Sequence, residues 1–139
     1  MYIKCIVENN GIKPTKAHES DAGFDLYSCE DTVISPRSNY TFDTNVRLLI
    51  PDGLVGFLKS KSGLNVNKCI VSEGVIDAGY TGTIRVKLYN HSDNSVVIKE
   101  GDKISQIVFL PTPTITLRAV SSFDTSTDRG DKGFGSSGR

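Results

Sequence analysis

Residues 83–90 constrain the fold of this chain more than any other stretch. Apolar and polar side chains alternate along them in the order Ile84, Arg85, Val86, Lys87, Leu88 and Tyr89. A repeat of two residues is typical of a β-strand that buries one face. We therefore expect the three aliphatic side chains to lie in a core and the other three to point away from it.

The residues before this strand predict a hairpin. Residues 75–77 form a short apolar run that ends in Asp77, and Ala78-Gly79 separates this run from the strand. Glycine adopts the positive φ that tight hairpin turns need. We therefore expect Asp77 at the mouth of a hairpin and Tyr80 just beyond the turn. From this stretch alone, the plainer interpretation is that Asp77 only ends a strand, because aspartate favours turns.

Short strand-like runs recur along the rest of the chain, separated by Gly, Pro, Asn and Asp, and helical spacing is scarce. The expected strands are residues 2–7, 24–28, 32–34, 40–50, 54–60, 68–71, 75–77, 83–90, 95–98, 103–110 and 114–118. Residues 62–67 are expected to form one short helical turn. Many short strands at this spacing predict an all-β sandwich or barrel.

The size and composition exclude several classes of protein. A chain of 139 residues is large enough for one domain with a real core. Its 37% hydrophobic and 23% charged residues exclude a disordered protein, and no apolar run approaches the roughly 20 residues of a membrane span. A formal net charge of zero gives no general attraction to nucleic acid, although a small polyanion can still bind a local group of cations.

No metal site built from protein side chains is expected. The three cysteines are widely spaced without a CxxC pair, and the two histidines, His18 and His91, lack ligand-like spacing. The first seven residues have a strand-like pattern and lack a signal-peptide pattern, so we expect a cytoplasmic location.

The composition changes near residue 119, which divides the chain into a β domain, residues 1–118, and a C-terminal arm, residues 119–139. The last eleven residues contain four glycines and one aromatic residue, Phe134, and burial cannot offset their ordering entropy. One interpretation is a disordered end. The other is a lid that orders on a ligand, because glycine amides, hydroxyls and the Arg129 guanidinium suit a phosphate group and Phe134 suits a planar ring.

Three further stretches carry polar groups that suit a ligand site. Residues 58–64 place two lysines and two serines before Gly63, which offers an unhindered amide. Gln106 lies inside an otherwise apolar strand, and Asp25 lies between apolar residues in residues 21–27. Each signal is weak alone, because exposed lysines are usually solvated and a single polar strand residue usually faces outward.

The order and spacing of these stretches resemble the five motifs of the trimeric dUTP diphosphatase (dUTPase) family. The matching segments, in order, are residues 21–28, 59–64, 74–90, 101–107 and 129–138. Together they span nearly the whole chain, and the third and fifth motifs are highly specific.

The resemblance implies a fold, an assembly and a reaction. The family folds as a β jelly roll of the β-clip type and forms a homotrimer with three active sites at subunit interfaces. It hydrolyses dUTP to dUMP and diphosphate, with Mg²⁺ held by the triphosphate, which agrees with the lack of a metal-binding pattern here. A viral member would act in the cytoplasm or nucleus of its host, and neither nucleic acid nor a membrane is implied as a partner.

The resemblance also implies roles for individual residues. Asp77 matches the catalytic aspartate, which orients the water that attacks the α-phosphorus. Tyr80 matches the tyrosine that packs on the deoxyribose, where a 2′-hydroxyl would clash. Asp25 would support the metal's water shell or the neighbouring framework. The other matching residues would bind substrate: Lys61, Ser62, Gly63 and Gln106 at the phosphates, the backbone near Gly74 and Arg85 at the uracil, and Arg129, Phe134, Ser136 and Ser137 in an arm from another subunit.

This sequence departs from the family pattern at three positions. Lys61 stands where arginine is usual and supplies a point charge in place of a two-pronged fork, so phosphate positioning is expected to be looser or assisted by Lys59. Gly79 replaces a second acid two residues after Asp77, which we interpret as a change of the turn or of an interface. Ser137 stands where threonine is common and keeps the hydroxyl.

Three alternatives are open at this point. A dCTP deaminase of the same fold, or one that also cleaves dUTP, needs a glutamate in its base pocket, for which Glu73 is the nearby candidate. A non-catalytic trimeric module would keep the fold for a binding or regulatory role. The third alternative is a structural β protein with a floppy tail. The presence of all five motifs favours the hydrolase over each of them.

Overall fold

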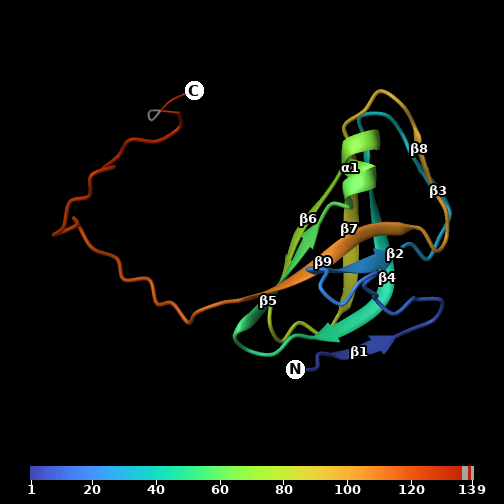
Figure 1. The fold of residues 1–139 in the computed structure, drawn as a ribbon, viewed down its shortest axis with the longest axis horizontal. Helices are drawn as coiled ribbons and strands as arrows, with labels where there is room; N and C mark the ends of the chain where they lie inside the picture. Colours follow the sequence, from blue (N-terminus) through green and yellow to red (C-terminus); the bar gives the residue numbers. More distant parts are fainter. Residues whose placement is uncertain (136–137, 139) are drawn as a thin grey trace.

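The computed structural model describes residues 1–135 and 138. Within these residues the chain forms nine strands and one short helix (Figure 1). Along the chain the elements are β1 (Lys4–Val7), β2 (Gly23–Tyr27), β3 (Thr32–Ile34), β4 (Asn39–Leu49), β5 (Leu54–Lys59), α1 (Ser62–Lys68), β6 (Ile70–Ile76), β7 (Thr83–Asn90), β8 (Val96–Ile98) and β9 (Lys103–Pro111). The prediction of a mostly β protein is confirmed. Within the described residues, no helix has the length and apolar character needed to cross a membrane.

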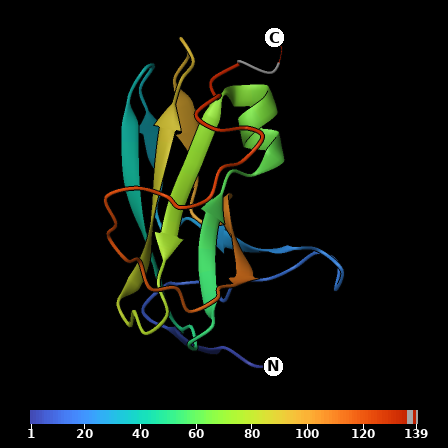
Figure 2. The ribbon, with the colours of Figure 1, turned by 90° about the vertical axis from the view of Figure 1, so that its left-hand side faces the viewer.

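Seven strands make one antiparallel sheet in the order β1-β4-β7-β6-β5-β9-β2, and β3 and β8 pair separately. The sheet is curled (Figure 2), and it packs around a core of mostly aliphatic side chains. Three of these, Ile84, Val86 and Leu88, are 0% exposed, as the alternation along β7 predicts. Phe42 on β4 and Ile107 on β9 lie in the same core. Because the core covers one face of β7, only the opposite face of this strand is available for other contacts.

Helix α1 connects β5 to β6 and reverses the chain at the end of the molecule opposite the N-terminus (Figure 1). It begins after Lys61 and ends at Cys69, which has a left-handed φ of 54° and donates its amide to the Asn65 carbonyl at 3.1 Å. The reversal lets β5 and β6 pair antiparallel. The helical turn expected at residues 62–67 is therefore confirmed, and it continues to Lys68.

Residues 68–71 and 75–77 were expected as two strands, but a single strand, β6, runs from Ile70 to Ile76 and includes parts of both. Gly74 lies opposite Leu58 in the ladder, and a Cβ at Gly74 would lie 3.1 Å from Leu58 Cδ1. The glycine lets β6 pass close to the leucine side chain and does not interrupt the strand.

The prediction of a strand at residues 114–118 is wrong, because the last strand ends at Pro111. Beyond Pro111 the described chain runs away from the sheet without a helix or strand of its own (Figure 1). Ile115 and Leu117 are 71% and 93% exposed. A strand needs a neighbouring ladder for its amides and carbonyls, and the segment lies against no strand of its own chain.

Candidate functional site

The two arms of the predicted hairpin separate partway along their length. Strands β6 and β7 pair only where residues 70–72 lie opposite residues 88–90. Beyond this point β6 pairs with β5, and β7 pairs with β4. A pocket of about 190 Å³ lies between the arms, lined by Val75, Ile76, Asp77, Tyr80, Thr83 and Arg85. Asp77 and Tyr80 therefore lie at the mouth of the hairpin, as the sequence predicts.

A tight turn carries the chain from Asp77 to Tyr80. The Tyr80 amide donates to the Asp77 carbonyl at 3.3 Å, and the Gly79 amide donates to the Ile50 carbonyl at 3.0 Å. Gly79 has a φ of 81°, a left-handed conformation that glycine adopts without strain. The turn thus gives a local reason for glycine at the position where the family pattern has an acid.

Tyr80 and Asp77 line the same pocket. The Tyr80 hydroxyl donates to the Thr83 carbonyl at 3.0 Å, and the residue is 44% exposed. The Asp77 side chain is exposed and takes part in none of the ion pairs among the described residues. Arg85 lines the same pocket. A carboxylate, a cation and an aromatic ring therefore share one small opening.

A second group of side chains, the Asp25 cluster, consists of Asp25, Lys61, Lys103 and Gln106. Asp25 on β2 lies opposite Gln106 on β9, and the Asp25 side chain is 7% exposed. Lys61 Nζ lies 2.5 Å from Asp25 Oδ1, and Lys103 Nζ lies 3.1 Å from Asp25 Oδ2. Burial raises the pKa of the Asp25 carboxyl, but hydrogen bonds and charges from the two lysines outweigh burial and hold this pKa below its ordinary value. Asp25 is therefore a buried anion.

The contacts of Asp25 support one of the two roles expected for it. Both of its carboxylate oxygens bind lysines, and little of the side chain reaches solvent. Asp25 fits the framework role, because it fixes the Lys61 ammonium next to the start of α1 and also raises the pKa of Lys103 through their hydrogen bond. A role of Asp25 in holding the water shell of a metal ion is still a prediction.

Gln106 ties β9 to the segment that leads into α1. Its Nε2 donates to the Ser60 carbonyl at 3.0 Å. Gly23 on β2 leaves room for this side chain, because a Cβ at Gly23 would overlap Gln106 Oε1 and lie 3.0 Å from Gln106 Cδ. Ser62 and Gly63, the first residues of α1, are exposed. The structure therefore places Gln106 near the residues that are predicted to bind the phosphates. Its own role as a hydrogen-bond donor to a phosphate is still a prediction.

Sequence reasoning missed Lys103 and Gly23. A register shift between Leu26 and Tyr27 interrupts the ladder beside Lys103, and nothing in the residue spacing indicates that shift. The space that Gly23 leaves is a property of packing and has no sequence signal of its own.

Lys59, expected to assist at the phosphates, binds Glu73 in this structure. Its Nζ lies 2.9 Å and 3.1 Å from the two Glu73 carboxylate oxygens. The two side chains are 48% and 59% exposed, so the pair is weak and can open. Glu73, the glutamate of this ion pair, is also the candidate that the deaminase alternative needs in its base pocket.

The hairpin pocket and the Asp25 cluster lie on different strands of the sheet. The pocket lies between β6 and β7 (Figure 2). Gln106 on β9 lies opposite both Asp25 on β2 and Lys59 on β5, and Lys59 lies opposite Glu73 in the middle of β6. Strands β5 and β9 therefore separate β6 from the Asp25 strand.

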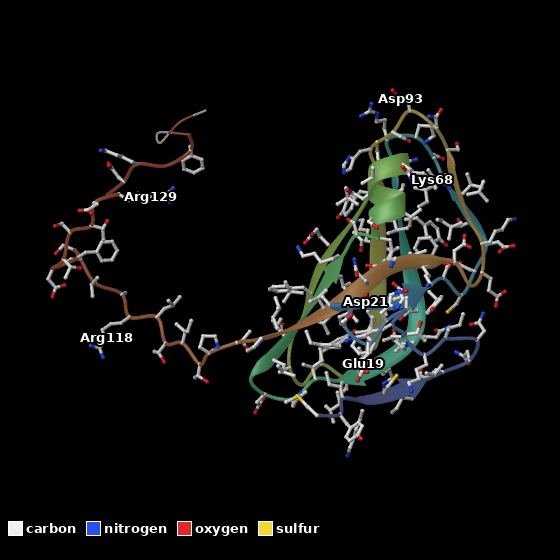
Figure 3. The ribbon with its side chains drawn as sticks, in the orientation of Figure 1. Glu19, Asp21, Lys68, Asp93, Arg118 and Arg129 are labelled. Carbon is white, nitrogen blue, oxygen red and sulfur yellow. The ribbon has the colours of Figure 1, made fainter. Side chains whose placement is uncertain are left out.

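Arg129 and Phe134, the predicted arm residues that the structure describes, lie away from both groups. Figure 3 shows Arg129 on the extended C-terminal segment, at a distance from the sheet. The Arg129 Nε donates to the Lys132 carbonyl at 2.8 Å, and Phe134 is fully exposed. Ser136 and Ser137 lie outside the described residues.

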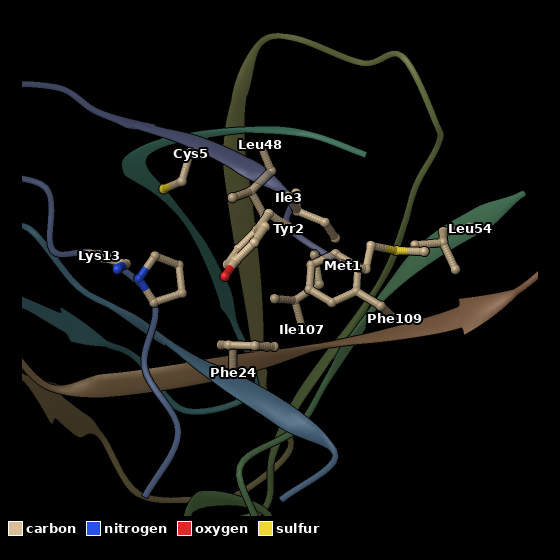
Figure 4. Close-up of a pocket in the computed structure, with 11 residues that line it drawn as sticks. Met1, Tyr2, Ile3, Cys5, Lys13, Phe24, Leu48, Leu54, Ile107 and Phe109 are labelled. Atoms are coloured by element: carbon tan, nitrogen blue, oxygen red, sulfur yellow. The ribbon is translucent and has the colours of Figure 1, made fainter. Parts of the chain in front are cut away.

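An apolar pocket of about 480 Å³ lies near the N-terminus (Figure 4). Its lining includes Tyr2, Phe24, Leu48 and Phe109. None of the predicted site residues lines this pocket, and an apolar wall does not suit a phosphorylated ligand.

The chain is similar in sequence to dUTPases of several sources. A dUTPase family model matches residues 9–138. The deoxyuridine 5'-triphosphate nucleotidohydrolase of Yaba monkey tumor virus is 42% identical over 126 residues, which cover 90% of this chain and 87% of that protein. The protein of the same name from Mycobacterium tuberculosis is 44% identical over 133 residues, which cover 90% of this chain and 86% of the relative.

The chain is also similar to solved dUTPase structures. The dUTPase of Staphylococcus bacteriophage 80alpha, solved with dUpNHpp, superposes with a TM-score of 0.93 at 32% identity and covers 99% of each chain. A variant dUTPase from the S. aureus phage phi11, which shows how a structural Mg(II) ion is coordinated, has a TM-score of 0.82 at 28% identity. That match covers 90% of this chain and 100% of the phage protein.

Proposed function

The chain belongs to the dUTPase family, and we propose that it hydrolyses dUTP to dUMP and diphosphate by attack of water on the α-phosphorus. The observation that carries the mechanism is that the exposed residue Asp77 and the aromatic residue Tyr80 line one pocket between β6 and β7. A carboxylate here can orient a water molecule and accept its proton, while the ring offers a flat face to a sugar.

The separated arms of the hairpin suit recognition of a base by backbone groups. Past Ser72 and Leu88, the facing edges of β6 and β7 form no ladder with each other, while each strand is paired on its outer side. The inward amides and carbonyls are therefore available to a ligand, and buried groups of this kind need partners. We place the uracil here, bound by the backbone near Gly74 and Arg85.

At the reacting centre, Asp77 orients the attacking water and takes up its proton as the new bond to the α-phosphorus forms. The bond between the α-phosphorus and the bridging oxygen breaks, and diphosphate leaves. Mg²⁺ bound by the triphosphate would neutralise part of the phosphate charge. Within residues 1–135 and 138, no three His, Cys, Asp or Glu side chains gather as a metal site.

The phosphates need cations and hydrogen-bond donors, which the start of α1 supplies. Ser62 offers a hydroxyl and Gly63 a backbone amide, and both residues are exposed. Lys61 supplies a charge that the buried Asp25 carboxylate holds in place. Lysine in place of arginine thus keeps a fixed positive charge at this position, but it lacks the paired N–H donors of a guanidinium.

We propose that these groups meet between subunits of a homotrimer with a jelly-roll fold. A nucleotide at Asp77 would reach the Ser62 and Lys61 of a neighbouring subunit, because in one chain the hairpin pocket lies between β6 and β7 whereas Lys61 binds Asp25 on β2, the edge strand of the sheet. The exposed C-terminal arm would cross to such a site. Phe134 would cover the uracil, and Arg129, Ser136 and Ser137 would bind the γ-phosphate.

Diphosphate release from dUTP tests this proposal, with UTP, dTTP and dCTP as controls and with Mg²⁺ present or removed. We expect rapid release from dUTP with Mg²⁺, much slower release without it, and little from the other three nucleotides. Equal rates with UTP would contradict the role of Tyr80, and ammonia released from dCTP would restore the deaminase alternative. No release from dUTP would contradict the activity itself.

A further inference from the structure

Gly82 lies in the loop between β6 and β7, two residues after Tyr80, and has no assigned role. A Cβ built at Gly82 would overlap the Tyr80 hydroxyl oxygen and lie 2.6 Å from Tyr80 Cζ and 3.1 Å from Tyr80 Cε2. All three of the nearest atoms belong to the Tyr80 side chain. The ring therefore folds back over Gly82 and occupies the space that a side chain would fill.

The backbone does not explain the glycine at this position. The described glycines with a positive φ include Gly79, in the same loop, at 81°, but not Gly82. Gly79 has the opposite surroundings, because nothing lies within 4 Å of a Cβ built there. One glycine of the loop thus serves the turn, and the other leaves room for the Tyr80 ring.

The position of the ring depends on weak contacts that a methyl group could overcome. The Tyr80 hydroxyl donates to the Thr83 carbonyl at 3.0 Å, and the side chain is 44% exposed. An exposed ring can swing into solvent at a small cost in stability. Alanine at residue 82 would therefore displace the Tyr80 ring and break its hydrogen bond to Thr83, while the fold would stay intact.

We propose that Gly82 is a positioning residue for sugar selection, which holds the Tyr80 ring at the place where it excludes a ribose 2′-hydroxyl. This inference rests on the proposed function, because it assumes that the sugar of dUTP packs on Tyr80. Gly82 acts only through the tyrosine and touches no reacting atom. Its effect therefore falls on selectivity and on KM, and it leaves the water-orienting Asp77 carboxylate unchanged.

The test compares kcat/KM for dUTP and UTP in the parent protein and in Gly82→Ala. Discrimination of a single hydroxyl by shape is worth about 10-fold to 100-fold, and we expect Gly82→Ala to lose roughly 10-fold or more of it. The kcat for dUTP should change little. Thr81→Ala is the matched control in the same loop, because the Thr81 carbonyl that accepts from Arg47 Nε is kept, and we expect parental selectivity from it.

A double-mutant cycle separates positioning from a general disturbance of the loop. In a Tyr80→Ala background the ring is absent, so the further change Gly82→Ala should cost no additional selectivity. Parental selectivity in Gly82→Ala, an additive loss in the Tyr80→Ala background, or an unfolded Gly82→Ala protein would each overturn the proposal. Loss of dUTP hydrolysis in the parent protein would instead contradict the proposed function, so the two failures are distinguishable.

Discussion

The Asp25 carboxylate lies 2.5 Å from the Lys61 ammonium, and the Asp25 side chain is only 7% exposed. Removing one partner of a buried pair leaves the other charge without compensation, which is more costly than losing an exposed pair. Asp25 is thus a structural anchor for the cation at the start of α1, and its contribution can be measured.

Asp25→Asn should destabilise the protein by about 2 kcal/mol at neutral pH, because Lys61 and Lys103 lose their shared anion but can still turn partly to solvent. The folded-state pKa of Asp25 is lowered, so its contribution is complete above the ordinary carboxyl pKa of about 4 and is lost as pH falls through the folded pKa. Chemical unfolding at pH 7 and pH 3 should therefore show a stability gap between parent and variant that narrows in acid.

The matched control for this measurement is Asp93→Asn. Asp93 also pairs with a cation, Arg37, at 2.8 Å, but the two side chains are 82% and 65% exposed. Its replacement should leave the unfolding midpoint nearly unchanged. An equal effect of the two substitutions would contradict the anchoring role of Asp25.

Asp77→Asn should keep nucleotide binding and reduce kcat by about 100-fold or more. The amide preserves the shape of the side chain but cannot accept a proton from the attacking water. Binding of dUpNHpp by calorimetry and single turnover of dUTP measure the two effects separately. Asp52→Asn is a suitable control, because Asp52 is an exposed acid that shares a pocket wall with Asp77 but does not line the pocket between β6 and β7. Near-parental turnover in Asp77→Asn would refute its role.

Gly23→Ala should raise KM for dUTP several-fold, because the new methyl group displaces Gln106 and removes its hydrogen bond to the Ser60 carbonyl. Gln106→Ala should give a similar KM, and the double variant should be no worse than Gln106→Ala alone. An unchanged KM in Gly23→Ala would show that Gln106 does not organise the start of α1.

Deletion of residues 129–139 should leave the thermal unfolding midpoint nearly unchanged and lower kcat/KM strongly. Apart from Gly133, the described residues of this segment are exposed, so their loss removes little buried surface. Scanning calorimetry and steady-state kinetics measure the two quantities. An unfolded or monomeric truncated protein would show that the segment is structural and is not a lid.

Alternation along β7 predicted its buried face correctly, because a strand with one face in a core must separate apolar from polar residues. The pattern failed where its physical basis was absent. Gly74 was expected to lie between two strands, 68–71 and 75–77, yet it lies inside β6 opposite Leu58. Residues 114–118 have strand-like composition but lie against no strand of their own chain, and composition does not reveal whether a partner strand exists.

The sequence predicted which residues belong to the candidate site better than it predicted how these residues are arranged in space. The hairpin mouth at Asp77 followed from local turn chemistry, which a sequence shows directly. The ion pair between Asp25 and Lys103 depends on a register shift, and the space beside Gly82 depends on how Tyr80 folds back. Such relationships depend on how side chains pack in the folded protein, so the spacing of residues along the chain does not predict them.

The central claim is that Asp77 of one chain works with Ser62 of another, and mixing two impaired chains tests it most directly. Asp77→Asn and Ser62→Ala are each expected to be poorly active alone. When the two are refolded together in equal amounts, random assembly should restore about a quarter of the sites, because an intact hairpin then meets an intact Ser62 from a neighbour. Recovery of diphosphate release from dUTP to about a quarter of the parental rate is the predicted result. A mixture no more active than its two separate components would contradict the account.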